Sequence, residues 1–245
     1  SDAGATAIDF IDKDVSADIA ATGTVDTAKV GTYTITYNVS DKSGNAAAAV
    51  VRTVNVIDNT VPVITLVGDA EATIEVNSTY TDAGATALDS TDGDLTAKIA
   101  VINPVDASKL GTYTVTYNVS DNSDNTAVEV TRKVNVVDST APVVTLNGDA
   151  EITVEAGAAY TDAGATAIDA YEGDLTDKVT LTGTVDTMKT GEYTLAYTST
   201  DSAGNEGSIT RKVTVVDTTS PVLALVGQAE LNHEGATTYT DAGAT

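Results

Sequence analysis

The stretch Gly111-Thr-Tyr-Thr-Val-Thr-Tyr-Asn-Val-Ser-Asp121 decides the fold of this chain. Within it, the tyrosines and valines from Tyr113 to Val119 alternate with threonines and an asparagine from Thr112 to Asn118. A period of two is typical of a strand with one face in a core and the other in water. The same stretch occurs at 31–41 and, in altered form, at 191–201. The chain is therefore built from one β-rich module that is repeated.

The repeat length follows from a short marker sequence. Asp2-Ala-Gly-Ala-Thr6 returns at Asp82, Asp162 and Asp241, at intervals of 80, 80 and 79 residues. A period of this size indicates a whole small domain rather than a solenoid unit. We expect repeats at 1–60, 61–140 and 141–219, and the opening strands of a fourth at 220–245. The first repeat is expected to lack its opening strands, as in a window cut from a longer array.

The third repeat is one residue shorter than the others. The missing residue lies between Asp201 and Arg211. Length changes between two strands are tolerated best in loops, so we expect the deletion in a hairpin loop.

Composition excludes several classes of partner. The formal charge is −24, from 12 basic and 36 acidic residues. Such a chain repels nucleic acid and anionic membrane surfaces, and we expect no nucleic-acid partner and no membrane insertion in this segment. Hydrophobic residues make up 42% of the chain, and their regular alternation argues against disorder. There is no cysteine, so disulfides cannot stabilise a domain of this small size.

The complete second repeat predicts an all-β fold. Strand patterns separated by turn residues recur about every 8–12 residues, as in an antiparallel sandwich. The expected strands are 63–66, 73–76, 80–88, 98–105, 111–119 and 128–137. Arg132 falls on the apolar face of the last strand, where a bulge or a sheet edge would explain it.

Four motifs carry a family resemblance. They are Tyr80-Thr-Asp-Ala-Gly-Ala-Thr-Ala87, Asp92-Gly-Asp-Leu-Thr96, the 111–117 stretch and Val136-Val-Asp-Ser-Thr-Ala-Pro142. They resemble the bacterial immunoglobulin-like repeat found in tandem in surface proteins and some pesticidal crystal proteins, which is related to the hyalin repeat. The resemblance implies tandem immunoglobulin-like β-sandwiches, an extracellular or cell-surface setting, and a stalk or adhesive role without catalysis. Gly111-Thr-Tyr113 also resembles the approach to a tyrosine corner.

Acidic residues supply the candidate chemistry. In a sandwich, the 89–94 loop, the 121–125 turn and the link at 56–62 lie at the same end. Carboxylates from these segments are then expected to converge at the joints between repeats. The candidate metal ligands are Asp58, Asp92, Asp94 and Asp121 at the first joint, and Asp138, Glu172, Asp174 and Asp201 at the second.

Several carboxylates at one joint suit Ca²⁺, which accepts six to eight oxygen ligands. The alternative is that each aspartate only caps its own turn. A shared ion would remove hinge freedom at each link, and the prolines at 62, 142 and 221 would stiffen it further. We therefore expect an elongated, calcium-stiffened rod whose partners are the neighbouring repeats of the same chain.

Catalysis is not expected, because a nucleophilic triad lacks a base other than His233, the one histidine, and a zinc site lacks cysteine and a second histidine. Two other functions stay open. One is an adhesive module for glycan or protein, with Tyr171 as the best exposed anchor. The other is a filament subunit that donates its 221–245 segment to an identical subunit, as in strand addition.

Overall fold

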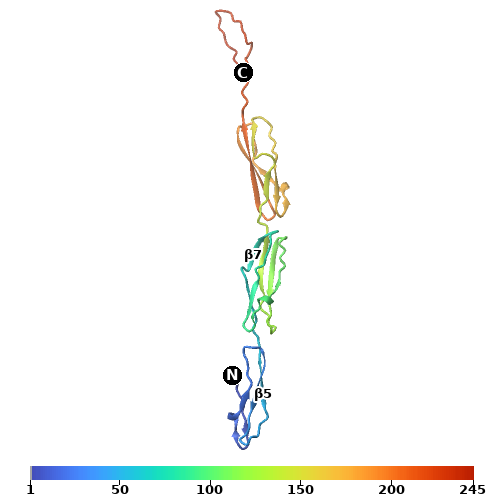
Figure 1. Cartoon of the computed structure of the whole chain (residues 1–245). Helices are drawn as coiled ribbons and strands as arrows, with labels where there is room; N and C mark the ends of the chain where they lie inside the picture. Colours follow the sequence, from blue (N-terminus) through green and yellow to red (C-terminus); the bar gives the residue numbers. More distant parts are fainter. Residues whose placement is uncertain (1) are drawn as a thin grey trace. The chain divides into compact units, whose positions relative to one another are not determined.

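The structure is a computed structural model that describes residues 2–245. The chain divides into two compact units, Ser1–Asp138 and Ser139–Thr245. The first unit holds two copies of the repeat, and the second holds one copy and the segment that follows it (Figure 1). No helix among the described residues is long and apolar enough to cross a bilayer.

The second repeat is a complete sandwich of two sheets. One sheet has the order β10-β11-β12-β7 and the other the order β6-β8-β9. Its elements are β6 (Val63–Leu66), β7 (Glu71–Glu75), β8 (Ala85–Asp89), β9 (Gly93–Asp94), the single-turn 3₁₀ helix η2 (Thr96–Lys98), β10 (Ala100–Ile102), β11 (Gly111–Asn118) and β12 (Val130–Val137).

The third repeat has the same plan, with sheets β14-β19-β18-β17 and β13-β15-β16. Its elements are β13 (Val143–Leu146), β14 (Glu151–Glu155), β15 (Ala165–Asp169), β16 (Gly173–Asp174), η3 (Thr176–Lys178), β17 (Thr180–Thr182), β18 (Gly191–Thr200) and β19 (Glu206–Val216). The prediction of tandem immunoglobulin-like sandwiches is confirmed. One strand pair in each complete repeat is parallel rather than antiparallel, β7 with β12 and β14 with β19.

The first repeat contains fewer strands. Its elements are β1 (Ile8–Asp9), β2 (Lys13–Asp14), η1 (Ser16–Asp18), β3 (Ala20–Thr22), β4 (Gly31–Asn38) and β5 (Val50–Val56). They form a β3-β4-β5 sheet and a β1-β2 pair.

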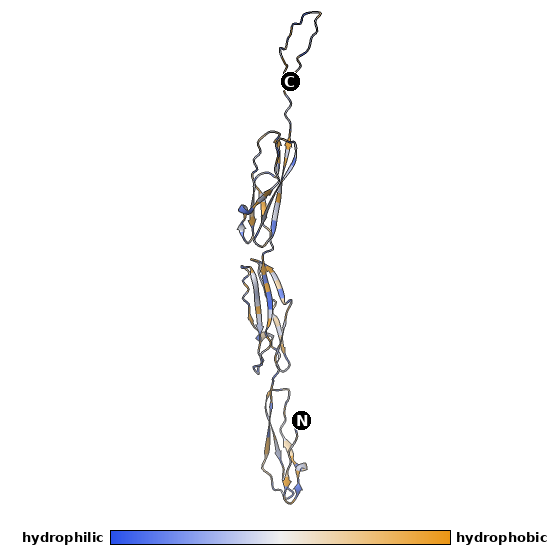
Figure 2. Cartoon of the chain, turned by 180° about the vertical axis from the view of Figure 1, so that it is seen from behind, coloured by the Kyte–Doolittle hydropathy of each residue, from blue (hydrophilic) through white to orange (hydrophobic). Residues whose placement is uncertain are grey.

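The core of the second repeat follows the alternation of β11. Val115 and Tyr117 are fully buried, and they pack with Ile64, Ala87 and other apolar residues between the sheets. Hydrophobic residues accordingly alternate with polar ones along the strands (Figure 2). The Tyr113 hydroxyl donates to the carbonyl of Lys109 at 3.0 Å. This bond to the backbone four residues upstream matches the expected tyrosine corner.

Arg132 is buried for a reason the sequence did not indicate. It lies inside the sheet rather than at an edge, because β12 pairs with both β11 and β7. Its guanidinium forms an ion pair with Asp82 and donates to the Tyr117 hydroxyl at 3.0 Å and to the Asp69 carbonyl at 2.9 Å. The expectation of a bulge or an edge was wrong, because a buried ion pair satisfies the charge instead.

The expected position of the deletion was also wrong. The loops 121–125 and 201–205 have equal length. In the second repeat the register changes between the Ser120–Thr126 bridge and the Tyr117–Val130 pair, which leaves a bulge in the last strand. In the third repeat one register continues from Gly191–Val215 to Thr200–Glu206. The shorter repeat has therefore lost a strand bulge, and its hairpin is regular.

Two expected strands are shorter than the pattern indicated. The strand expected at 80–88 begins only at Ala85, and the one expected at 98–105 is the three-residue β10. The hydrogen bonds of Tyr80 and Gly84 to the Asp82 carboxylate explain the first difference, because they hold 80–84 as a turn.

Candidate metal centre

Two strands of the second repeat, and the link that enters it, lead into buried aspartates. Asp89 follows Ala85 and Ala87 on the buried face of β8. Asp121 continues the buried series of Tyr117 and Val119. Asp58 lies two residues after β5, in the link that enters the second repeat. The end of the hydrophobic core is therefore closed by buried carboxylates.

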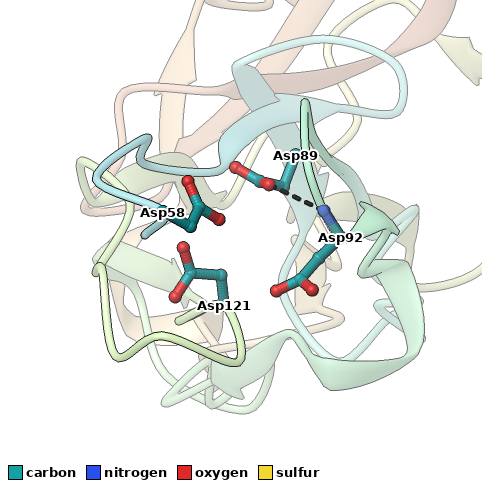
Figure 3. Close-up of side chains that lie close together, drawn as sticks. All are labelled: Asp58, Asp89, Asp92 and Asp121. Atoms are coloured by element: carbon teal, nitrogen blue, oxygen red, sulfur yellow. Dashed lines mark hydrogen bonds between the residues drawn. The ribbon is translucent and has the colours of Figure 1, made fainter. Parts of the chain in front are cut away.

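These carboxylates meet at one place. Asp58, Asp89, Asp92 and Asp121 each contribute an oxygen within 4.8 Å of the others. The four side chains face a common space (Figure 3). Asp58, Asp89 and Asp121 are only 8%, 3% and 6% exposed. In the part of the chain that the structure describes, none of the four forms an ion pair with Lys or Arg.

Backbone hydrogen bonds hold the carboxylates in place. Oδ1 of Asp89 accepts the N–H groups of Thr91 and Asp92 at 2.7 and 2.9 Å, and these bonds lower the pKa of Asp89. Burial raises the pKa of Asp121, but hydrogen bonds from the Asn125 side chain and backbone outweigh it, so this pKa is lowered as well. Both groups are therefore anionic at neutral pH.

Asp58 supplies the observation that points to a ligand. Its Oδ1 accepts the Thr60 N–H at 2.9 Å, but its Oδ2 is buried without a hydrogen-bond partner. A buried anionic oxygen without a donor is costly unless a cation satisfies it. The donors present are hard carboxylate oxygens, which suit Ca²⁺ or Mg²⁺ rather than a soft transition metal. The residues therefore fit a calcium ion.

Hydrogen bonds also connect the two loops and the link directly. The Asn125 side chain donates to the Asp58 carbonyl at 3.1 Å. Both oxygens of Asp92 accept bonds from Asn122, each at 2.7 Å. The 89–94 loop, the 121–125 turn and the link thus form one connected network.

The predicted ligands divide into two groups. The structure brings Asp58, Asp92 and Asp121 together with Asp89, which the sequence-based reasoning missed. Asp94 lies outside this cluster and accepts the Thr96 N–H at 2.8 Å, which is turn capping. The alternation of β8 could have separated the two aspartates. Asp89 lies two residues after Ala87 and so points to the core, whereas Asp94 pairs with Leu88, which is exposed.

The second unit repeats part of this arrangement. Asp169 and Asp201 are buried at the positions of Asp89 and Asp121, with oxygens within 4.8 Å. Oδ2 of Asp169 has no hydrogen-bond partner. Glu172 connects its loop to the 201–205 turn as Asp92 does in the second repeat, because it accepts the Ser202 N–H at 2.6 Å. It also forms an ion pair with Lys178. Asp174 caps the Thr176 N–H at 2.9 Å. Asp138, at the end of the first unit, is buried.

Comparison with known proteins identifies the family. The model for "Bacterial surface protein, Ig-like domain" matches residues 1–56, 64–136 and 144–215. The chain belongs to this family. The description of the family places this type of Ig-like domain in bacterial surface proteins.

Two curated proteins and one solved structure are similar to this chain. The chain is 36% identical over 166 residues to pesticidal crystal protein Cry22Aa of Bacillus thuringiensis, covering 59% of this chain and 22% of that protein. It is 34% identical over 211 residues to hyalin of Strongylocentrotus purpuratus, covering 80% of this chain and 17% of hyalin. The chain thus spans about a fifth of these relatives. Human CDH23 EC21–23 is a structural neighbour with a TM-score of 0.32 and 16% identity, over 85% of each chain.

Proposed function

We propose that this bacterial surface Ig-like chain is a non-catalytic extracellular spacer whose links are fixed by calcium. The proposed ion is held by Asp58, Asp89, Asp92 and Asp121. The observation that supports it is the partnerless Oδ2 of Asp58, buried among three other carboxylates. The partners of such a spacer are the neighbouring repeats of its own chain, on a cell surface or an extracellular protein.

Calcium suits this cluster better than magnesium. Magnesium demands near-ideal octahedral geometry and keeps several waters, whereas calcium accepts many oxygens in flexible geometry. Three of the carboxylates are buried. The four carboxylates come from three separate segments, the link, the 89–94 loop and the 121–125 turn, and such a set suits flexible coordination better than strict octahedral coordination. The ion, when bound, supplies the positive charge that no Lys or Arg provides here.

The mechanical consequence concerns the link. Ile57 and Val61 on either side of it are 67% and 50% exposed, so apolar packing does little to hold residues 57–61. It is attached to the second repeat by the Asn125–Asp58 bond, by the bonds of the Thr60 hydroxyl with Asp89 and Ser90, and by the buried Pro62. A cation shared by Asp58 and the two loops adds a further attachment, which lowers the conformational freedom of the joint. By the same reasoning, Asp169 and Asp201 form part of a second site.

The test compares substitutions of two aspartates, Asp58 and Asp94, at the end of the second repeat where the link enters. Asp58→Asn removes one negative charge and places an amide donor among the other carboxylates. In EDTA we expect this variant to melt no lower than the wild type, and in calcium we expect it to bind fewer ions and gain less stability. Calorimetric melting and calcium titration measure both effects.

Asp94→Asn is the matched control. The amide oxygen of the variant can still accept the Thr96 N–H, so we expect its melting temperature to change little and its calcium-induced shift to equal that of the wild type. A wild-type melting curve that EDTA leaves unchanged contradicts the calcium proposal. A calcium shift that Asp94→Asn abolishes and Asp58→Asn preserves contradicts the assigned ligands.

A second candidate function is a self-assembling filament subunit. Its proposed contact is strand addition by residues 221–245, a segment that repeats the pattern of residues 62–86. The adhesive alternative has less support, since Tyr171 is 36% exposed at the tip of its loop.

A further inference from the structure

Lys178 forms an ion pair with the acidic loop of the third repeat. It is the last residue of η3, and its Nζ lies 3.2 Å from Oε2 of Glu172. The other carboxylate oxygen of Glu172, Oε1, accepts the Ser202 N–H at 2.6 Å. One oxygen of Glu172 therefore holds the 201–205 turn, and the other is paired with a lysine.

The second repeat directs the corresponding lysine to a different partner. Lys98, the last residue of η2, donates to Oδ1 of Asn122 at 2.6 Å. The backbone and side-chain N–H groups of Asn122 donate to the two oxygens of Asp92. Within the part of the chain that the structure describes, Lys98 forms no ion pair with a carboxylate. A neutral amide thus separates the ammonium group from the acid.

Two differences between the repeats account for the change of partner. Glu172 stands at the position of Asp92 and is longer by one methylene, so its carboxylate extends further from the loop. Ser202 stands at the position of Asn122 and has no side-chain carbonyl that could accept from a lysine. Its hydroxyl donates to Glu172 instead. The lysine of the third repeat is therefore bound by the acid itself.

This ion pair adjoins the candidate cation site of the third repeat. Asp169 and Asp201 are buried, with carboxylate oxygens within 4.8 Å of one another, and Oδ2 of Asp169 has no hydrogen-bond partner. The Glu172 N–H donates to Oδ1 of Asp169 at 2.9 Å, and the Glu172 carboxylate accepts from Ser202, which follows Asp201. Glu172 thus connects Lys178 to both buried aspartates.

We infer that Lys178 lowers the calcium affinity of the third-repeat site below that of the second-repeat site. The inference rests on the proposed calcium function and names a residue that sets the affinity. The charge of Lys178 repels a divalent cation that enters beside Asp169, and Glu172 becomes a ligand only by giving up its ion pair. Asp92 has no such competitor, because neutral amide donors leave its carboxylate the full negative charge.

Lys178 then has opposite effects with and without the ion. Without calcium, its charge offsets part of the repulsion between the carboxylates at this end of the third repeat. With calcium, the same charge opposes the cation. We therefore expect the two sites to fill in sequence as the calcium concentration rises, the second-repeat site first. The wild-type isotherm should show two classes of site, and Asp58→Asn should remove the tighter class.

The test measures calcium affinity by calorimetric titration of the whole chain carrying Asp58→Asn, so that the third-repeat site dominates the signal. In this background, Lys178→Met should tighten calcium binding about threefold to tenfold, because it removes a unit charge near a divalent ion. Lys178→Arg keeps the charge and should leave the affinity unchanged. Lys189→Met is the charge-matched control. It lies before β18, at the opposite end of that strand from Asp201, beyond the range of screened charges.

Melting in EDTA separates this role from a structural one. Without calcium, Lys178→Met should lower the melting temperature of the third repeat slightly, since the lysine is half exposed. A lysine with a structural role alone would lower stability in EDTA and leave calcium affinity unchanged. An unchanged or weaker affinity in Lys178→Met, or loss of the weaker class of site in Asp58→Asn, overturns the inference while the calcium proposal stands. A wild type without saturable calcium binding overturns both.

Discussion

Replacing Arg132 tests the energetic role of the buried ion pair. Its side chain is 3% exposed, and it donates to Asp82, to Tyr117 and to the carbonyls of Asp69 and Gly84. Arg132→Met leaves the Asp82 carboxylate without its counter-charge and the carbonyls without donors. Breaking a buried pair from one side costs about 3–5 kcal/mol. For a domain of this size, each kcal/mol lowers the melting temperature by about 4–8 °C.

The expected result is therefore a fall of at least about 12 °C in the transition of the second repeat. The matched control is Arg52→Met. Arg52 forms the equivalent pair with Asp2, but the two side chains are 38% and 30% exposed, and such pairs contribute below about 1 kcal/mol. Calorimetry of the full chain measures the shift, and limited proteolysis identifies the repeat that unfolds. Equal shifts in the two variants would refute the reasoning.

Two further predictions concern stability. Burial raises the pKa of Asp82 and Asp162, but hydrogen bonds from Tyr117 and Tyr197 and the arginine pairs outweigh it, so both pKa values lie below the ordinary 3.8. The contribution of these two carboxylates to the free energy of unfolding is complete above pH 3.8 and is lost as the pH falls through their lowered native pKa values. Melting temperatures measured from pH 5 to 2 should therefore drop below pH 3.8. A melting temperature that does not change over this range would contradict the prediction. In the regular hairpin of the third repeat, Gly207→Ala would place a Cβ against the carbonyl oxygen of Pro142. We expect this variant to lose about 1–3 kcal/mol of unfolding free energy in denaturant melts. Ser208→Ala, at the exposed neighbouring position, should change the unfolding free energy little.

The fold was predictable because its main strands alternate strictly. The Gly111–Asn118 alternation predicted β11, the repeat length predicted tandem domains, and the spacing of strand and turn patterns predicted the sandwich. The bulge was not predictable, because a one-residue difference between two strands looks the same in sequence whether it falls in the loop or in the strand. Arg132 was misread because its partner Asp82 is 50 residues away.

The candidate site was predictable in part. The expectation that loops at one end of the sandwich converge brought Asp58, Asp92 and Asp121 together. It included Asp94 and missed Asp89 because aspartates of one loop look alike in sequence unless the phase of the preceding strand is followed into the loop. Strand phase separates them, since Asp89 continues the buried side of β8 and Asp94 does not.

The central claim is that the carboxylates at the link hold calcium. The most direct measurement is a calorimetric calcium titration of the chelator-stripped chain beside its Asp58→Asn variant. The account predicts saturable binding by the wild type and a smaller number of bound ions in the variant. Identical isotherms, or no saturable heat in the wild type, would contradict it.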